Sequence, residues 1–458
     1  MKQPILLFFA FFLAFSAKAQ QPITLFNAPH LTDNSSVNPA YLGTSQWELV
    51  VLPLTSTIYS DGPTFNDFIT KKDGRNVLTY PAAELSFDQN NLFQASTTVE
   101  TFRLIYNHKD WSIALHHASI AEGRMNYSGA LLAVAIQGNA PFIGQNIALD
   151  TDFSALSYEE VGISGALELG KLTIGGRLKL LAGHSTAKTR KGQLSLRTDD
   201  DIYQLSLDAD LAIDVAGPTN GDLTTFNFGP LDLNFSNNSD VLIPSPNFLF
   251  NYNNNLFNFG SNSGMAFDFG ATWRMSDQWG LSFSALNIGR INWTDNPRNY
   301  TANEVFEFDG INLGRLTFND DEGFVFDNIS DSLDILQFDK TTEAFVTNLP
   351  AQFFLGLDYE PNEKWRFGAT AYHRQILNNS FSALALSGNF QIIKTVNIGL
   401  AYSLMNQNYS LLGGNVALNL GPIQLYALTD NLLGLFHLAG SRTLNARVGL
   451  RLALGPKI

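Results

Sequence analysis

The sequence predicts an all-β protein: a transmembrane antiparallel up-and-down β-barrel of about 14–18 strands. Three observations predict this fold. Apolar residues alternate with small or polar residues along most of the chain, a short apolar leader precedes them, and three tight polar turns are each followed at once by a tryptophan. Alternation with a period of two is the pattern of a strand with one apolar face.

Composition limits the classes of function. The chain has 458 residues, of which 45% are hydrophobic and only 15% charged, and it has no cysteine. So much apolar surface excludes a disordered chain, and the lack of cysteine excludes a disulfide scaffold or a cysteine-ligated metal. The net charge of −14 argues against a nucleic-acid partner, because phosphate recognition requires a basic surface.

The first residues have the three parts of a secretory signal peptide. A short basic start precedes an apolar run from Ile5 to Phe15, and Ala17-Lys18-Ala19 then forms a cleavage motif before Gln20. We expect residues 1–19 to be the signal peptide, with cleavage between Ala19 and Gln20. No later stretch approaches the roughly eighteen apolar residues of a spanning helix, so the exported chain is expected to use strands.

The alternating segments are expected to be barrel strands. They include 161–169, 172–180, 205–215, 267–273, 396–404 and 448–454. Several are close to the ~9–11 residues with which a tilted strand crosses a bilayer, and longer than the ~5–6 of an average globular strand. We therefore expect an outer-membrane barrel at 46–458, preceded in the mature chain by a separate segment at 20–45.

The polar faces of these strands combine small residues with isolated charges of both signs. The charges expected to face the lumen are Arg177, Lys179, Asp208, Asp210, Asp214, Asp268, Arg274, Arg447 and Arg451. A cation facing lipid would cost ~2–4 kcal/mol at mid-bilayer, which favours the lumen side. We expect the three aspartates of 208–214 to form cross-strand pairs with Arg177 and Lys179 and to fill the lumen. The alternative is a selectivity surface for a permeating solute.

Aromatic residues mark one boundary of the membrane. Trp111, Trp279 and Trp365 each follow a tight polar turn, and Tyr106 and Tyr359 hold the mirror position before two of these turns. Amphipathic rings are enriched at the lipid–water boundary, where a row of them forms a girdle. The alternative is that these tryptophans cap the core of a soluble sandwich.

The connections are of two lengths. Six are tight turns, whereas 216–263 and 289–350 are long and rich in asparagine and phenylalanine. Outer-membrane barrels have short periplasmic turns and long extracellular loops, so we expect the long segments to be packed extracellular loops. Placing every tight turn on the periplasmic side requires two extra crossings, for which Phe142–Leu149 and Thr225–Phe235 are candidates.

No catalytic or metal-binding motif is recognisable. The chain has no G-x-S-x-G, no H-E-x-x-H, no Walker A sequence and no Ca²⁺ loop. His116 and His117 are adjacent, so in a strand they point to opposite faces and cannot share a metal. We therefore expect neither an enzyme nor a protein with a metal or cofactor.

Near the mature N-terminus, Asn38-Pro39-Ala40 resembles the Asn-Pro-Ala tripeptide of FadL-like long-chain fatty acid transporters. It is also similar to related barrel proteins associated with type IX secretion. The resemblance implies that residues 20–45 form an N-terminal hatch inside the barrel, and that hydrophobic ligands can pass through it.

Longer stretches resemble an uncharacterised family of outer-membrane barrels of Bacteroidota-type bacteria, defined as a domain of unknown function. They are 267–293, 349–372 and 396–434. This resemblance implies a cell outer-membrane location and a barrel fold, with outer-membrane lipid as surroundings, but no established activity.

Two functions are compatible with these features. The first is a barrel that passes or binds a hydrophobic small molecule, as the hatch motif and the phenylalanine-rich loops indicate. The second is a structural or secretion-associated barrel that binds a surface or secretion-system protein through its long loops, where function tends to lie.

Overall fold

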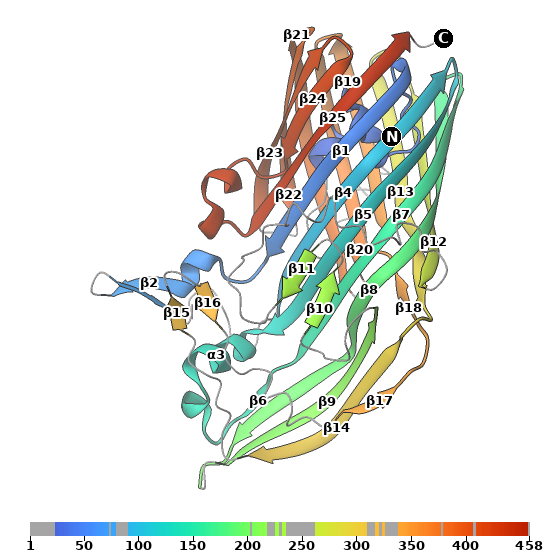
Figure 1. Cartoon of the computed structure of the whole chain (residues 1–458). Helices are drawn as coiled ribbons and strands as arrows, with labels where there is room; N and C mark the ends of the chain where they lie inside the picture. The colour runs from blue at the N-terminus through green and yellow to red at the C-terminus, as the bar shows by residue number, and fades with distance from the viewer. Residues whose placement is uncertain are drawn as a thin grey trace, which may run out of the picture.

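The computed structural model describes residues 23–72, 75–78, 90–201, 204–217, 225–228, 231–234, 262–308, 317–319, 323–325, 338–376, 379–405 and 409–456. Within this part of the chain, fourteen antiparallel strands close into a barrel (Figure 1). They are, in ring order, β1 (Ser45–Ser60), β4 (Asn90–His108), β5 (Trp111–Ser128), β7 (Thr151–Leu169), β8 (Leu172–Thr198), β12 (Ser263–Arg274), β13 (Trp279–Trp293), β19 (Gln352–Asn362), β20 (Trp365–Ile376), β21 (Asn379–Ile393), β22 (Val396–Met405), β23 (Tyr409–Leu420), β24 (Ile423–Thr429) and β25 (Thr443–Pro456).

The ring closes because the first strand pairs with both β4 and the last strand. Ser45 lies opposite Pro456 and Tyr59 lies opposite Thr443, so β1 and β25 are paired over nearly their whole lengths. Closure removes the two free edges that an open sheet would have. The predicted antiparallel barrel is therefore confirmed, and its strand number lies at the lower bound of the predicted range.

The two faces of the wall differ as the alternation predicts. On β22, Ile398, Leu400, Tyr402 and Leu404 are exposed on the outside, whereas Asn397, Gly399, Ala401 and Ser403 are buried inside. The same outward apolar row recurs on the other strands, for example at Ile163 and Leu167 of β7 and at Phe267 and Phe269 of β12. The barrel thus presents an apolar outer surface, opposite to the arrangement of a water-soluble protein.

Six tight connections lie at one end of the barrel, the end at which β1 begins and β25 ends. They join β4 to β5, β7 to β8, β12 to β13, β19 to β20, β21 to β22 and β23 to β24. We call this the turn end and the opposite one the loop end. In Figure 1 the turn end is at the top, beside the C-terminus.

The loop end carries a sheet that continues beyond the ring. The last part of β8 pairs with β9 (Leu205–Ala216), which pairs with β14 (Arg298–Phe308), which pairs with β17 (Asp339–Thr341). Two short strands, β6 (Asn146–Ala148) and β18 (Phe345–Asn348), extend β8 and β13. We call these the loop-end sheet; it lies at the bottom of Figure 1.

Three short hairpins complete the described strands. They are β2 (Ile69–Lys72) with β3 (Arg75–Leu78), β10 (Thr225–Phe228) with β11 (Leu231–Asn234), and β15 (Thr317–Asn319) with β16 (Gly323–Val325). The short helical turns near the loop end are η2 (Phe65–Phe68) and η3 (Ala140–Phe142).

One element differs from the sequence-based expectation, because segment 205–215 forms β9, which lies outside the ring. In addition, Gly129–Gln137 forms the helix α3, which no sequence pattern above predicts; its N-cap is Ser128, whose Oγ accepts from the Leu131 amide at 3.1 Å. Because neither segment crosses the wall, the ring neighbour that follows β5 is β7, and the ring neighbour that follows β8 is β12. The extra crossings proposed at Phe142–Leu149 and Thr225–Phe235 are therefore not needed.

No helix in the described part of the chain is long and apolar enough to cross a membrane. The expected signal peptide with its cleavage pair Ala19 and Gln20 lies outside the described residues, as does much of the two expected loops at 216–263 and 289–350.

Candidate functional site: the hatch and the barrel lumen

The segment Ile23–Thr44, which we call the hatch, lies inside the turn-end half of the lumen (Figure 1). It contains the helix α2 (Ile23–Phe26) and the 3₁₀ turn η1 (Thr32–Ser36), and most of its side chains are buried. Helices this short are not stable in isolation. The conformation of the hatch is therefore set by the barrel wall that surrounds it.

The Asn-Pro-Ala tripeptide lies against a pair of glycines in the wall. The Asn38 carboxamide accepts from the Ala40 amide at 3.0 Å and donates to the Phe283 carbonyl of β13 at 3.2 Å. Gly175 of β8 and Gly270 of β12 are register partners. A Cβ on Gly270 would lie 2.1 Å from the Asn38 Oδ1, and one on Gly175 would lie 2.3 Å from the Pro39 carbonyl oxygen. Only glycine permits this approach.

A buried ion pair joins the hatch to β25. Arg447 donates through Nε and Nη2 to both carboxylate oxygens of Asp33, and the Tyr426 hydroxyl donates to Asp33 Oδ2 at 2.6 Å. All three side chains are buried. A buried charge is tolerated when its partners satisfy it, so this bidentate pair fixes η1 in one position.

A second group of buried charges joins the wall to the hatch backbone. Arg177 pairs with Asp268 at 2.9 Å and donates to the carbonyl oxygens of Ser35 and Ser36. Lys179 lies between Asp268 at 3.2 Å and Glu160 at 3.3 Å. The network continues through a hydrogen bond to His116, whose Nε2 lies 3.1 Å from Glu160 Oε1.

The α2 end of the hatch is held by neutral hydrogen bonds and one carboxylate. The Thr24 amide donates to Asp430 Oδ1 at 2.8 Å, just beyond the end of β24. Thr370 of β20 donates to the Asn27 side chain at 2.6 Å, and Asn389 of β21 donates to the Asn27 carbonyl at 2.7 Å. These contacts satisfy polar groups that the lumen buries.

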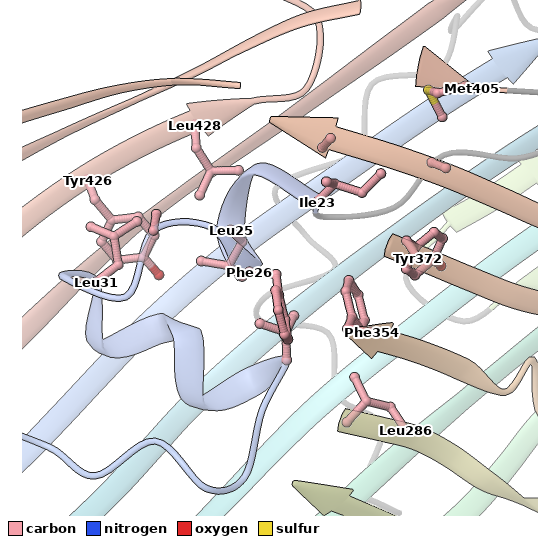
Figure 2. Packing of buried hydrophobic residues seen from close by; sticks show 14 of the residues in the cluster. Ile23, Leu25, Phe26, Leu31, Leu286, Phe354, Tyr372, Met405, Tyr426 and Leu428 are labelled. Carbon is pink, nitrogen blue, oxygen red and sulfur yellow. The ribbon is translucent and has the colours of Figure 1, made fainter. Parts of the chain in front are cut away.

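The apolar side chains of the hatch meet an apolar patch inside the lumen (Figure 2). The Phe26 ring stacks on Phe354 at 4.7 Å between centroids, and Phe354 contacts Tyr372 at 4.6 Å. The full cluster contains Ile23, Leu25, Phe26, Ala28, Leu31, Val37, Leu286, Phe354, Tyr372, Phe381, Ala383, Ala385, Met405, Ala417, Tyr426 and Leu428. Its wall residues come from β13 and from β19 to β24. The two groups of buried charges described above lie on the other arc of the ring, whereas a further pair, Arg366 with Asp358 at 3.1 Å, lies on β20 and β19.

Burial shifts the pKa values of three groups at the hatch. Burial opposes the ionised form of Asp33, but the Arg447 guanidinium outweighs it and holds the pKa of Asp33 below its usual value. Burial raises the pKa of Asp430 to about 6 despite the hydrogen bond from Thr24. Burial, assisted by Arg366, lowers the pKa of His30 to about 4. At neutral pH the hatch therefore contains an ion pair and a neutral imidazole.

Four of the expected lumen charges lie inside the barrel. Arg177, Lys179, Asp268 and Arg447 are buried in the two groups described above. Arg451 lies at the turn end, where it donates to Glu48 Oε1 at 2.7 Å and to the Thr44 hydroxyl at 2.9 Å. The structure thus places charges from β8, β12 and β25 around the hatch.

The other expected lumen charges lie elsewhere. Arg274 is exposed at the last position of β12, at the rim of the turn end. Asp208, Asp210 and Asp214 lie on β9 in the loop-end sheet and not beside Arg177 and Lys179. Their partners lie further along β8, where Arg190 pairs with Asp214 at 2.8 Å and Lys191 pairs with Asp210. The expected pairing was wrong because β8 is 27 residues long and continues past the ring.

The expected girdle residues lie together at the turn end. Trp279 packs on Tyr359 at 4.6 Å between centroids, and Tyr106 packs on Trp111 at 5.6 Å. Trp365 stacks on Phe390 at 4.4 Å. The three tryptophans are each about two-fifths exposed on the outside of the wall. Their role at a lipid–water boundary stays a proposal, taken up below.

Sequence reasoning missed several buried charges, and the reason is local. Glu100 and Arg103 are three residues apart yet both buried, and the register of β4 against β5 shifts between Glu100 and Phe102. His116 and His117 on the partner strand β5, expected on opposite faces, are both buried as well. A β-bulge changes which residues face inward, so a strict period of two cannot place these side chains.

The profile of the Family of unknown function (DUF5723) matches residues 39–430. The chain belongs to this family. The match begins at Pro39, inside the Asn-Pro-Ala turn, and ends at Asp430, the residue that accepts a hydrogen bond from Thr24 of α2. None of the curated protein sequences matches the chain.

Among solved structures, the chain is similar to a mutant of the monoaromatic hydrocarbon channel TodX, with 10% identity, a TM-score of 0.45 and 96% of each chain covered. It is similar to the Ralstonia pickettii toluene transporter TbuX (10% identity, TM-score 0.33, 91% of this chain and 92% of that chain). It is also similar to a Pseudomonas aeruginosa FadL homologue (11%, 0.39, 95% and 94%). Because all three TM-scores lie below 0.5, the function is argued below from the chain's own residues.

Proposed function

We propose that this family member is an outer-membrane barrel that binds a hydrophobic small molecule in its lumen and passes it when the hatch moves. The observation that carries the proposal is the apolar cluster between the hatch and the arc from β13 to β24 (Figure 2). A lumen that served only water-soluble solutes would have no need of stacked rings at its centre. Small-molecule sites are typically apolar with a few placed polar groups.

The outer surface supports the proposed location. Rows of exposed leucine, isoleucine and phenylalanine cover the outside of the wall, and tryptophans lie where the strands reach the turn end. An apolar band bounded by aromatic rings is the surface of an outer-membrane barrel. In this proposal the turn end is periplasmic, the loop end is extracellular, and the expected signal peptide directs export.

The hatch supports the proposed route. Its side chains occupy the positions in the apolar cluster that a hydrophobic ligand would take, since Phe26 covers Phe354 and Ile23 and Leu25 belong to the same cluster. Displacing α2 would therefore expose an apolar surface inside the barrel. α2 is held by a few hydrogen bonds and by its apolar packing, with no ion pair of its own, so in this proposal it leaves the wall while the Asp33–Arg447 pair holds η1.

The buried charges are assigned a positioning role rather than catalysis. Arg447 and Arg177 direct their donors at the hatch, and Lys179 is neutralised by Glu160 and Asp268. In the described part of the chain, one group of side chains meets the spacing of a metal site: the half-buried Asp199 with the exposed Asp200 and Asp201. They lie in a solvated turn at the loop end, away from the hatch, and the proposal assigns them no ligand.

The test is a disulfide that locks the hatch. The chain has no cysteine, so Asn27→Cys with Thr370→Cys introduces a single tether where the two side chains now lie 2.6 Å apart. The purified protein in proteoliposomes is given radiolabelled toluene and, separately, radiolabelled palmitate. Oxidation should abolish protein-dependent uptake of the accepted probe, and reduction should restore it.

The matched control is a tether outside the lumen. Ser56 and Thr97 lie 3.5 Å apart across β1 and β4 on the exposed side, so Ser56→Cys with Thr97→Cys closes a disulfide that leaves the hatch free. Uptake through this variant should not respond to oxidation. If the hatch tether forms and uptake of both probes continues at the unlocked rate, the proposed route is wrong.

A second candidate function is favoured by the loop-end sheet. β9 and β14 extend the wall beyond the ring, and Val305 at their pairing is exposed. This surface suits a structural or secretion-associated barrel that binds a partner protein. The test is co-purification from membranes: Val305→Glu should remove a specific partner that Asp200→Lys retains, and identical sets of bound proteins would dismiss this candidate.

A further inference from the structure

The barrel wall is interrupted at one strand. β24 has 7 residues, fewer than the ~9–11 of a membrane-crossing strand, whereas its neighbours β23 and β25 have 12 and 14. Its pairing with β23 ends where Thr429 meets Gly414. The chain then leaves the wall as residues 430–442, which we call the wall loop and which contains η5 (Gly434–Phe436) and η6 (Leu438–Gly440). Figure 1 shows it as two red coils beside the barrel.

The wall loop exposes an unusual set of side chains. Phe436 is 79% exposed, Leu433 is 66% exposed and Leu438 is 60% exposed, and Leu435 is exposed as well. Single exposed leucines are common on proteins, but four large apolar side chains within six residues form a patch. Something apolar must cover this patch in the protein's natural surroundings.

The loop leaves the wall at a height where the outer surface is still apolar. The Leu432 amide donates to the Leu412 carbonyl of β23 at 2.7 Å, and Leu412 is the register partner of Tyr402 on β22. Tyr402 and Leu404 are both exposed on the outside at this level. A Cβ on Gly414 would lie 2.7 Å from Leu432 Cδ1, so Leu432 covers the outer face of that glycine. The apolar surface is therefore continuous from the wall to the loop.

The loop pairs part of its own backbone. The Asn431 side chain accepts from the Gly434 amide at 3.0 Å and donates to the Thr443 carbonyl at 2.8 Å. The amides of residues 436, 437, 440 and 441 all donate to carbonyls within the loop. This pairing lowers the cost of bringing the loop close to hydrocarbon, where each unpaired backbone group costs several kcal/mol.

We propose that the wall loop is a lipid-binding element whose Leu433, Phe436 and Leu438 side chains lie among the acyl chains of the surrounding bilayer. This inference rests on the proposed membrane location but not on the proposed hydrophobic ligand. The occupant is the lipid chain because the patch continues the outward apolar rows of β22 and β23. A protein partner would instead need a contact surface raised above the bilayer.

The test is site-directed spin labelling of the full chain in phospholipid bilayers. Because the chain has no cysteine, Phe436→Cys gives a single nitroxide on the wall loop. Leu400→Cys on the outside of β22 is the lipid reference, and Asp200→Cys in an exposed loop-end turn is the water reference. We expect the label at 436 to collide with oxygen as often as the label at 400, and to be shielded from a water-soluble nickel chelate.

The references separate the two proposals. If the label at 436 collides with nickel as often as the label at 200 while position 400 stays shielded, the wall loop is in water and this inference is overturned. If position 400 is itself accessible to nickel, the membrane location fails. Each labelled variant must give the same far-ultraviolet circular dichroism spectrum as the unlabelled protein, and Leu433→Cys provides a second label in case Phe436→Cys does not.

Discussion

The Asp33 carboxylate and the Arg447 guanidinium form the most specific contact between hatch and wall, and both are buried. We expect Asp33→Ala to lower the free energy of unfolding by about 3–5 kcal/mol, since it leaves Arg447 without its main partner. Urea unfolding of the protein in phospholipid vesicles measures the change.

The matched variant removes both charges. Asp33→Leu with Arg447→Leu should be clearly more stable than Asp33→Ala, because no uncompensated charge stays buried. A double variant as unstable as the single one would mean that the pair does not act through its charge.

Two other residues give the hatch opposing responses to acid. Burial raises the pKa of Asp430 to about 6, so the folded chain takes up this proton before the unfolded chain does, and stability gains between pH 6 and about 4. Burial lowers the pKa of His30 to about 4, so the unfolded chain binds this proton first, and stability is lost as pH falls from about 6.5 to 4. Each effect is about 3 kcal/mol at most.

We therefore expect the two variants to depart from the wild type in opposite directions. From pH 7 to pH 4.5, Asp430→Asn should lose stability relative to the wild type, and His30→Gln should gain. Urea unfolding midpoints at the two pH values measure both. Parallel shifts in the two variants would contradict the assigned burial of these groups.

At the scale of single residues, the sequence predicted the lumen charges that follow a regular alternation and missed those beside a bulge. Arg177 and Lys179 lie on a regular stretch of β8, and they do face the lumen. Asp268 faces it as well, because its pairing with β8 is regular although the register of β12 against β13 shifts there. Glu100 and Arg103 flank a register shift, which depends on the partner strand and leaves no local signal. Asp33 was not predicted because its partner Arg447 is more than four hundred residues away in sequence.

At the scale of elements, the close contact of β8 and β12 with the hatch depends on two glycines, Gly175 and Gly270, which have no side chain to block it. Gly270→Ala would place a methyl group 2.1 Å from Asn38 Oδ1, so the Asn-Pro-Ala turn must move away from the wall. We expect the amides of the hatch to exchange hydrogen at least several-fold faster, because local opening costs less free energy. Hydrogen exchange followed by mass spectrometry of the hatch peptide measures this.

The control is a glycine on the adjacent strand β13. A Cβ on Gly280 would meet its nearest neighbour at 3.9 Å, so Gly280→Ala should leave exchange in the hatch unchanged. Equal acceleration in both variants would show that the close approach at Gly270 does not hold the turn.

At the scale of elements, the sequence predicted which segments form strands. It did not predict which of those strands belong to the barrel ring. The alternation in 205–215 is real, but β9 pairs with β14 beyond the barrel, and alternation does not distinguish a lipid-facing strand from one in a projecting sheet. Conversely, 129–137 reads as apolar and forms α3, because Ser128 caps a helix there. Short apolar runs are ambiguous between helix and strand.

For the whole molecule, two arcs of one ring have different roles in the account. The arc from β25 through β12 supplies the charged side chains that bind the hatch, and the arc from β13 to β24 carries the apolar cluster together with the Asp358–Arg366 pair. The sequence predicted the closed barrel, since alternation and turn spacing are local properties. It could not predict this division, because it arises only when strands distant in sequence close the ring.

The most direct test of the membrane barrel is a nitroxide scan along β22 in phospholipid bilayers. The account predicts frequent collision with oxygen at Ile398, Leu400, Tyr402 and Leu404, and infrequent collision at Asn397, Ala401 and Ser403, because the first row faces acyl chains and the second faces the filled lumen. Oxygen accessibility without this alternation, or a folded protein that stays in water without detergent or lipid, would contradict it.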